Sequence, residues 1–232
     1  MATFGVIVFP GSNCDHDAYH AMKHVLGCET KFLWHKDTDL SGIDFLIVPG
    51  GFSYGDYLRS GAIARFSPIM QEVIKFANNG GPVMGICNGF QILLEAGLIP
   101  GAMMHNHKLR FVCKNVNIRC ETTDSLFTGS LQKGQVFDIP VSHGEGNYFI
   151  DQDGLKSLQD NDQVLFRYSD ASGNLTEEAN FNGSIDHIAG ITNTGRNVLG
   201  MMPHPERAME KILGSEDGKP IFESILNSLS VA

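Results

Sequence analysis

Short apolar runs alternate with helical patterns through the first hundred residues, and this alternation constrains the fold more than any other feature of the chain. Apolar strands separated by helices predict an α/β fold, a mostly parallel, twisted sheet with helices on both faces. In such a sheet, ligands bind outside the carboxyl ends of the strands. The expected strands are Thr3–Phe9, Lys31–His35, Asp44–Pro49 and Pro82–Ile86, and the expected helices are Asp15–Leu26, Pro68–Asn78 and Asn88–Ala96.

The pattern changes after Arg110, where strand signals outnumber helical ones. The stretch from Asp151 to Gly183 is rich in Asp, Asn, Gly and Ser, and we interpret it as excursions on the surface. No repeat, low-complexity tract or linker interrupts the chain, so residues 1–232 are expected to form a single domain. Further strands are expected at Val116–Cys120, Val136–Ser142, Val164–Tyr168, Ile188–Thr192 and Asn197–Met201, with a closing helix at Pro220–Leu229.

Composition argues against several classes of protein. Hydrophobic residues make up 42% of the chain, ample for one continuous core, and charged residues only 19%, too few for a disordered chain. The net charge of −9 argues against a nucleic-acid binder, which needs a basic patch. No run approaches the roughly 20 apolar residues of a membrane-spanning helix. The five cysteines form no Cys-x-x-Cys pair and the N-terminus lacks an export signal, so we expect reduced thiols and a cytoplasmic location.

The sequence Gly85-Ile86-Cys87-Asn88-Gly89 is a G-x-nucleophile-x-G pattern with cysteine as the nucleophile. It lies between an expected strand and an expected helix, and its two glycines permit the tight turn that lifts Cys87 out of the sheet. The N-terminus of the following helix favours the thiolate and leaves backbone N–H groups free. Among these, the N–H of Asn88 is the expected oxyanion donor. Cys14, at the start of the first expected helix, is the one alternative nucleophile.

A thiol nucleophile needs a general base, and the base needs an orienting partner. Pro203-His204-Pro205-Glu206 supplies both within three positions, directly after an expected strand. Pro205 biases His204 to an extended conformation, in which His204 and Glu206 point to the same side. The sequence therefore predicts a catalytic triad of Cys87, His204 and Glu206.

The other histidines give weaker signals. His16, His20 and His24 recur every four residues on the first expected helix, but no carboxylate or cysteine pattern completes a metal-ligand set. We interpret them as a solvated helix face and predict no metal site. His105 and His107 lie in one loop and are candidates for the wall of a pocket.

Pro49-Gly50-Gly51-Phe52 follows the third expected strand, in the same half of the sheet as Cys87. Adjacent glycines let backbone N–H groups face a developing oxyanion without obstruction by side chains. The N–H of Gly51 or Phe52 is therefore expected to complete the oxyanion hole with that of Asn88.

Along the chain, the Pro-Gly-Gly loop comes first, the turn around Cys87 second and the His-Pro-Glu segment third. With these elements in this order, the chain resembles the class I, triad-type glutamine amidotransferases, which implies a flavodoxin-like fold. Further motifs narrow the resemblance to the glutaminase subunits of phosphoribosylformylglycinamidine synthase, from de novo purine synthesis. Gly50–Ala62 (GGFSYGDYLRSGA) is the most specific, because most class I amidotransferases differ after Pro-Gly-Gly. Most also have leucine where this chain has Asn88, and Phe181 stands where proline is expected. The other matching motifs are PGSNCD at Pro10–Asp15, GICNGFQ at Gly85–Gln91, SHGEG at Ser142–Gly146 and NVLGMMPHPER at Asn197–Arg207.

The resemblance implies that glutamine is hydrolysed through a thioester on Cys87 and that the ammonia passes through a shielded channel. The chain has no P-loop or other recognisable ATP site, so a partner must use the ammonia. The implied partners are an ATP-dependent synthetase subunit, which aminates phosphoribosylformylglycinamide, and a small bridging subunit. No cofactor is expected in this chain, whereas ATP and magnesium are expected on the synthetase. The candidate glutamine contacts are Gly50, Gln91, Arg110, Ser142, His143 and Gly144.

Alternatives from other classes stay open at this point. A cysteine hydrolase of the same fold, acting on another amide or on an ester, would share the turn around Cys87 but has no reason to carry the extended GGFSYGD loop. A non-catalytic regulatory domain typically lacks the nucleophile or the base. If the amidotransferase interpretation holds, activity of the isolated chain should be low until the partner aligns the oxyanion loop.

Overall fold

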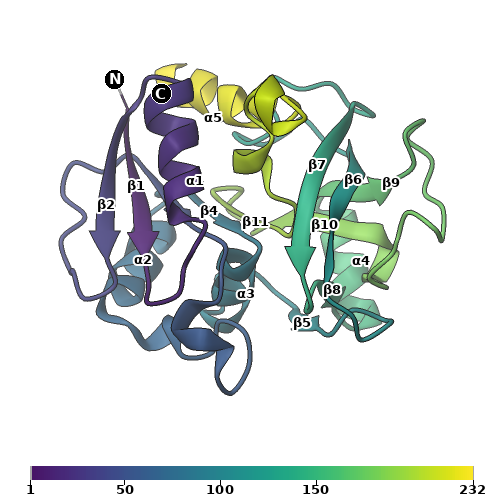
Figure 1. The fold of residues 1–232 in the computed structure, drawn as a ribbon, viewed down its shortest axis with the longest axis horizontal. Helices are drawn as coiled ribbons and strands as arrows, with labels where there is room; N and C mark the ends of the chain where they lie inside the picture. Colours follow the sequence, from purple (N-terminus) through teal and green to yellow (C-terminus); the bar gives the residue numbers. More distant parts are fainter. Residues whose placement is uncertain (1, 232) are drawn as a thin grey trace.

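The computed structural model describes residues 2–231, which form a nine-stranded sheet and a separate two-stranded sheet (Figure 1). The large sheet has the strand order β2-β1-β3-β4-β11-β10-β9-β6-β7, and the small one pairs β5 with β8. The strands are β1 (Thr3–Val8), β2 (Glu29–Trp34), β3 (Phe45–Val48), β4 (Val83–Ile86), β5 (Ala102–Met104), β6 (Val112–Cys120), β7 (Val136–His143), β8 (Asn147–Phe149), β9 (Val164–Ser169), β10 (Ile188–Thr192) and β11 (Val198–Met201). The α-helices are α1 (Asp15–His20), which continues as a π-helical turn over Ala21–Val25, α2 (Pro68–Asn78), α3 (Asn88–Glu95), α4 (Gln152–Asp160) and α5 (Lys219–Val231).

Strands β2, β1, β3, β4 and β11 are parallel and form one half of the large sheet, at the left and centre of Figure 1. From β1 the chain crosses to β2 at the edge of the sheet, and from β3 it crosses to β4 in the opposite direction across the sheet. Because both crossovers are expected to be right-handed, the helices that they contain, α1 and α2, lie on opposite faces. Strands β3, β4 and β11 are buried along their whole length, as covered parallel strands must be. The expected α/β fold is confirmed.

Strands β10, β9, β6 and β7 continue the sheet in antiparallel order, at the right of Figure 1. The sheet is therefore mixed. It is parallel where strands alternate with helices and antiparallel where the sequence after Arg110 shows strands with fewer helices. Residues of β7 alternate between buried and half-buried positions, as in an antiparallel strand with one face on the core.

The carboxyl ends of β4 and β11 lie at the same level of the sheet. Ile86, the last residue of β4, pairs with Met201, the last residue of β11, and the N–H of Cys87 donates to the carbonyl of Met201 at 2.8 Å. Strand β3 lies on the other side of β4, with Val48 opposite Gly85. The segments that follow β3, β4 and β11 therefore leave the sheet side by side.

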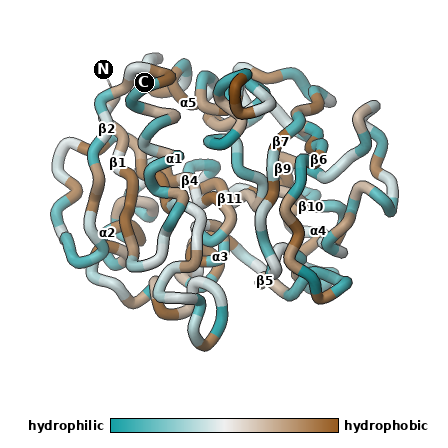
Figure 2. The backbone as a smooth tube through the Cα atoms, in the orientation of Figure 1, coloured by the Kyte–Doolittle hydropathy of each residue, from teal (hydrophilic) through white to brown (hydrophobic). Residues whose placement is uncertain are grey.

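Helix α2 shows how the sequence determines a helix in this fold. Pro68 occupies its first position, where the missing N–H would have no partner in the helix, and Ile69, Met70, Val73 and Ala77 recur at helical spacing and are buried. Apolar residues are likewise concentrated along the strands of the large sheet, as Figure 2 shows. None of the helices within residues 2–231 is long and apolar enough to cross a membrane.

Helix α4 lies inside the stretch that we interpret from the sequence as surface excursions; Gln152–Asp160 lie largely on the surface, but they form a helix that the sequence did not predict. Leu158 is its one fully buried residue in the described structure, and the helix is too polar to stand out in the sequence. Asp151 determines where it begins, because its carboxylate accepts a hydrogen bond from the N–H of Gly154 at 2.7 Å.

Candidate active site

Cys87 lies on a strained turn between β4 and α3. Its backbone angles, φ 52° and ψ −106°, fall in a region that non-glycine residues rarely occupy, as at the nucleophile turns of hydrolases. The flanking glycines are needed for close packing. A Cβ at Gly89 would collide with the carbonyl oxygen of Val48, and one at Gly85 would lie 2.7 Å from the carbonyl oxygen of Gly89. The turn therefore presents Cys87 at the edge of the sheet, where its Sγ lies 3.7 Å from the carbonyl oxygen of Ser142.

His204 and Glu206 form a buried pair. The distance from Nδ1 of His204 to Oε1 of Glu206 is 2.7 Å, and each side chain is only 1% exposed. Burial opposes the imidazolium, but the carboxylate of Glu206, followed by the charge of Cys87 and the nearby sulfur of Cys14, raises the pKa of His204 well above its ordinary value. Within the described chain, Nε2 of His204 has no hydrogen-bond partner, so it is available to a substrate or to the thiol.

The backbone of this segment differs from the expectation. His204 is non-helical (φ −103°, ψ 83°), but Pro205–Arg207 form a 3-10 turn, so the prediction of an extended segment through Glu206 is wrong. The pair still forms, because the tight turn brings Glu206 back toward the imidazole. The N–H of His204 donates to the carbonyl of Pro140 on β7 at 2.8 Å, which fixes the segment against the antiparallel half of the sheet.

Gly50 is the point at which the three segments meet. A Cβ at this position would lie 2.8 Å from Cε1 of His204, 3.1 Å from Sγ of Cys14 and 3.4 Å from Cβ of Cys87. The missing side chain therefore leaves the space in which the imidazole of His204 and the side chain of Cys87 come together.

A cavity of about 280 Å³ opens beside Cys87. Seven residues singled out in the sequence line it: Gly51, Phe52, Cys87, Gln91, Ser142, His143 and Gly144. The five other residues that line it are Asp56, Ser60, His105, Phe111 and Glu145. Of these, only His105 was a candidate for a pocket wall from the sequence. Gly50 packs behind the cavity, and Arg110, which we expected from the sequence to contact glutamine, is exposed and does not line it.

Only one of the two alternative oxyanion donors on the loop after β3 has a free N–H in the described structure. The N–H of Phe52 donates to the carbonyl of Gly11 at 2.9 Å, so in this conformation it is not available to an oxyanion. Of the two alternatives expected from the sequence, Gly51 and Phe52, the structure therefore leaves Gly51 available and not Phe52. Gly51 has φ +130°, and the positive φ angles of Tyr54, Asp56 and Leu58 show that strain extends along the loop.

The side chain of Asn88 ties this loop to α3. Its Oδ1 accepts from the N–H of Ser53 at 3.0 Å, while its Nδ2 donates to Oδ1 of Asp56 at 3.1 Å and to Oε1 of Gln91 at 2.8 Å. Gln91 in turn donates to the carbonyl of Glu145 at 2.7 Å. Motif reasoning assigned only the backbone of Asn88 to the site. The replacement of the usual leucine by an amide was the one signal of this second role.

His143 forms part of the cavity wall and is neutral. Burial, and to a smaller extent the charge of His204, lower the pKa of His143 to about 3. Its Nδ1 lies 3.0 Å from Oδ1 of Asn106, which also accepts from the N–H of Gly146, so the Nδ1–H tautomer fits this contact. Phe181, at the position where proline is expected, packs against His143 with 5.7 Å between ring centroids.

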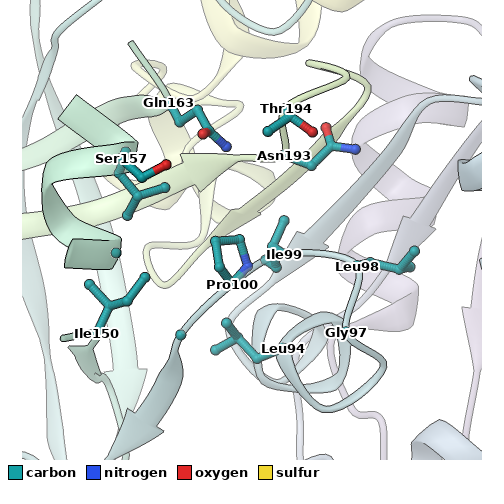
Figure 3. Close-up of a pocket in the computed structure, with 13 residues that line it drawn as sticks. Leu94, Gly97, Leu98, Ile99, Pro100, Ile150, Ser157, Gln163, Asn193 and Thr194 are labelled. Atoms are coloured by element: carbon teal, nitrogen blue, oxygen red, sulfur yellow. The ribbon is translucent and has the colours of Figure 1, made fainter. Parts of the chain in front are cut away.

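A second cavity, of about 560 Å³, lies between the end of α3 and α4 (Figure 3). Leu94, Pro100 and Ile150 give it apolar walls, with Ser157, Gln163 and Asn193 among its polar residues. None of the described residues that line it is titratable, in contrast to the cavity beside Cys87. Of these two cavities, only the one beside Cys87 is lined by groups capable of acid–base and nucleophilic chemistry.

Comparisons with known proteins agree with this arrangement. The family model of the CobB/CobQ-like glutamine amidotransferase domain matches residues 2–220. The chain is 60% identical over 230 residues to the phosphoribosylformylglycinamidine synthase subunit PurQ of Salinibacter ruber, covering 99% of this chain and 98% of the relative. It is 58% identical, with the same coverage, to the subunit of that name from Chlorobaculum tepidum. A chain in the solved structure of PurLQS from Thermotoga maritima aligns with a TM-score of 0.86 at 44% identity, covering 98% of this chain and 99% of its own.

Proposed function

Because the chain belongs to the family of CobB/CobQ-like glutamine amidotransferase domains, we propose that it is the glutaminase subunit of a phosphoribosylformylglycinamidine synthase. The observation that carries this proposal is the convergence on Gly50 of Cys87 and the buried His204–Glu206 pair, next to a cavity large enough for a small amino acid. The chain also spans nearly the whole length of the relatives that bear this name.

The proposed reaction begins at Cys87. Its thiolate attacks the side-chain amide carbon of glutamine, and the amide oxygen becomes an oxyanion. His204, held as an imidazolium by Glu206, gives its Nε2 proton to the amide nitrogen, so that the carbon–nitrogen bond breaks and ammonia leaves. The neutral imidazole then takes a proton from water, whose hydroxide attacks the glutamyl thioester and releases glutamate and the thiol.

Backbone groups stabilise the oxyanion in this mechanism. The N–H of Asn88, at the first turn of α3, and that of Gly51 are the available donors, because the N–H of Phe52 already donates to Gly11. The walls formed by Gln91 and by Ser142–Gly144 hold the amino-acid end of glutamine. Arg110 is not proposed as its carboxylate partner, since it is exposed away from the lining.

Ammonia must pass to another polypeptide. The relatives are named as subunits of a synthase, and the solved neighbour is described as PurLQS, which supports a synthetase subunit and a bridging subunit as partners. Exposed apolar side chains lie on the loop after β3 and on the facing loop: Phe52, Tyr57, Leu58, Leu109 and Phe111. Covering them would bury apolar area and enclose the cavity mouth, so we place the synthetase there. ATP and magnesium belong to the synthetase in this proposal, and the complex acts in the cytoplasm.

A test separates ammonia production from ammonia use. The chain, wild type or Cys87→Ser, is mixed with the synthetase and bridging subunits, ATP, magnesium and phosphoribosylformylglycinamide. Wild type should form phosphoribosylformylglycinamidine from glutamine, whereas Cys87→Ser should form it only from added ammonium chloride. Glutamine-dependent product formation by Cys87→Ser at the wild-type rate would contradict the proposal.

A further inference from the structure

Cys14 lies against the catalytic pair, although no step of the proposed reaction uses it. Its Sγ, a ring nitrogen of His204 and a carboxylate oxygen of Glu206 all lie within 4.8 Å of one another, and the three residues are buried. The same sulfur lies on the Gly50 side of the imidazole, where a Cβ at Gly50 would touch it at 3.1 Å. Cys14 does not line the cavity beside Cys87, so it contacts the pair from behind.

An ion pair holds the sulfur in place. Nη2 of Arg207 donates to Sγ of Cys14 at 3.1 Å, and Nε of the same guanidinium donates to Oδ2 of Asp17 at 2.8 Å. Asp17 is on α1, which begins directly after Cys14, and the N–H of Cys14 donates to the carbonyl of Gly50 at 3.3 Å. The start of α1 is thus connected both to the segment that carries the base and to the segment that carries the oxyanion donor.

This setting does not suit a second nucleophile. Burial raises the pKa of the Cys14 thiol, with the charges of His204 and Arg207 only partly offsetting it, so the neutral thiol is favoured. The neutral sulfur accepts a hydrogen bond from Arg207 and lies next to the imidazole of His204. It can therefore help to hold that ring in position.

We infer that Cys14 is a positioning residue of the glutaminase, whose sulfur, held by Arg207, fixes the His204–Glu206 pair on the side away from the substrate. The inference rests on the proposed function, since it assigns His204 as the acid and base. The role of Cys14 explains why position 50 is a glycine, which leaves space for both the sulfur and the imidazole. It also explains why Arg207 directly follows Glu206 in the sequence.

Removal of the sulfur should change the titration of the base. The titratable and charged groups that face His204 are Cys87 at the start of α3, Cys14 at the start of α1, Glu206 and Arg207 on its own turn, and His143 on β7. Among them Cys14 and Cys87 are sulfur neighbours that raise the pKa of His204, so loss of Cys14 should make His204 lose its proton at lower pH.

The test compares Cys14→Ala, Cys14→Ser and the control Cys120→Ala in the complex assembled with the synthetase and bridging subunits. Cys120 is also a buried cysteine but lies on β6. Active sites are counted by labelling with diazo-oxo-norleucine, so that unfolded protein does not enter kcat. Cys14→Ala should lower kcat about tenfold with KM changed less than about twofold, as expected for a small misplacement of a catalytic group. The alkaline limb of its kcat profile should move to lower pH, while Cys14→Ser restores most of kcat.

A second readout does not depend on activity. In the isolated chain, the low-field proton resonance of the His204 Nδ1–H should shift or broaden in Cys14→Ala and remain in Cys120→Ala. Wild-type kcat per active site and an unmoved alkaline limb in Cys14→Ala, or an unchanged Nδ1–H resonance, would overturn the inference. Absence of glutamate release by the wild-type complex would instead contradict the proposed function, and the resonance would still decide the role of Cys14.

Discussion

The N–H of Phe52 donates to the carbonyl of Gly11 at 2.9 Å, and this bond holds the loop after β3 against the loop before α1. A Cβ at Gly11 would collide with the carbonyl oxygen of Phe52, so the two loops are in close contact. While the bond exists, Gly51 is the only one of the two alternative donors of this loop whose N–H is free within the described residues. The structure thus has Cys87 and the His204–Glu206 pair beside a loop whose Phe52 N–H is engaged elsewhere.

The first prediction concerns the isolated chain. Its glutaminase kcat should be at least about tenfold lower than in the complex, since one oxyanion donor is worth about 10²-fold or more in kcat. Binding of the synthetase should release Phe52 from Gly11. Steady-state glutamate release, with and without the synthetase and bridging subunits, measures the difference. Equal kcat values in the two samples would show that the loop needs no rearrangement.

Gly50→Ala should lower kcat about 100-fold or more, corresponding to about 3 kcal/mol of transition-state stabilisation. The new methyl group would lie 2.8 Å from Cε1 of His204 and 3.4 Å from Cβ of Cys87, so one of them must move. Gly80→Ala is the control for backbone strain without crowding, because no atom lies within 4 Å of its Cβ position but its φ is +88°. The measurement is kcat per active site. A Gly50→Ala variant as active as Gly80→Ala would refute the packing argument.

Glu206→Gln should lower kcat about 100-fold with little change in KM, because the carboxylate orients the imidazole and stabilises its charged form. The pKa of His204 should fall, since burial would then no longer be offset by the negative charge next to Nδ1. Titration of the His204 imidazole by NMR, alongside glutamine kinetics, measures both effects. An unchanged pKa of His204 in the variant would contradict the assigned ion pair.

His143 should make the stability of the protein depend on pH. Its pKa of about 3 in the folded protein lies below the ordinary value of 6.5. Below about pH 6.5 the unfolded chain therefore binds a proton that the folded one does not. The free energy of unfolding should fall by up to about 1.4 kcal/mol per pH unit between pH 6.5 and pH 3 from this group alone. Urea unfolding at pH 7, 6 and 5 should show a weaker pH dependence in His143→Gln than in wild type. The exposed His24→Gln is the control, and a wild-type slope in His143→Gln would disprove the linkage.

The parts of the fold that local patterns determine could be predicted from the sequence. Helix α2 begins and ends at the expected residues, because Pro68 and the spacing of its apolar residues are local signals. The turn at Cys87 could be predicted for the same reason, since the glycines that permit it are its neighbours in the sequence. Helix α4 could not, because its N-cap and a single fully buried leucine are weak signals in a polar stretch.

Contacts between segments far apart in the sequence could not be predicted from local sequence patterns. The engagement of Phe52 by Gly11 and the contact of Arg207 with Cys14 join residues that only the sheet topology brings together. The same holds for the side chain of Asn88, whose partners Ser53 and Asp56 lie on the loop after β3. The proposed reacting groups could be predicted from sequence motifs, whereas the contacts that support them required the structure.

The most direct test of the central claim, that Cys87 is the nucleophile of a glutaminase, is the rate of glutamate release from glutamine by the assembled complex. Wild type and Cys87→Ser are compared under identical conditions, with Cys28→Ser as a control for replacing a buried cysteine away from the catalytic triad. Wild type and Cys28→Ser should release glutamate, whereas Cys87→Ser should release none above background. Release by Cys87→Ser at the wild-type rate would contradict the claim.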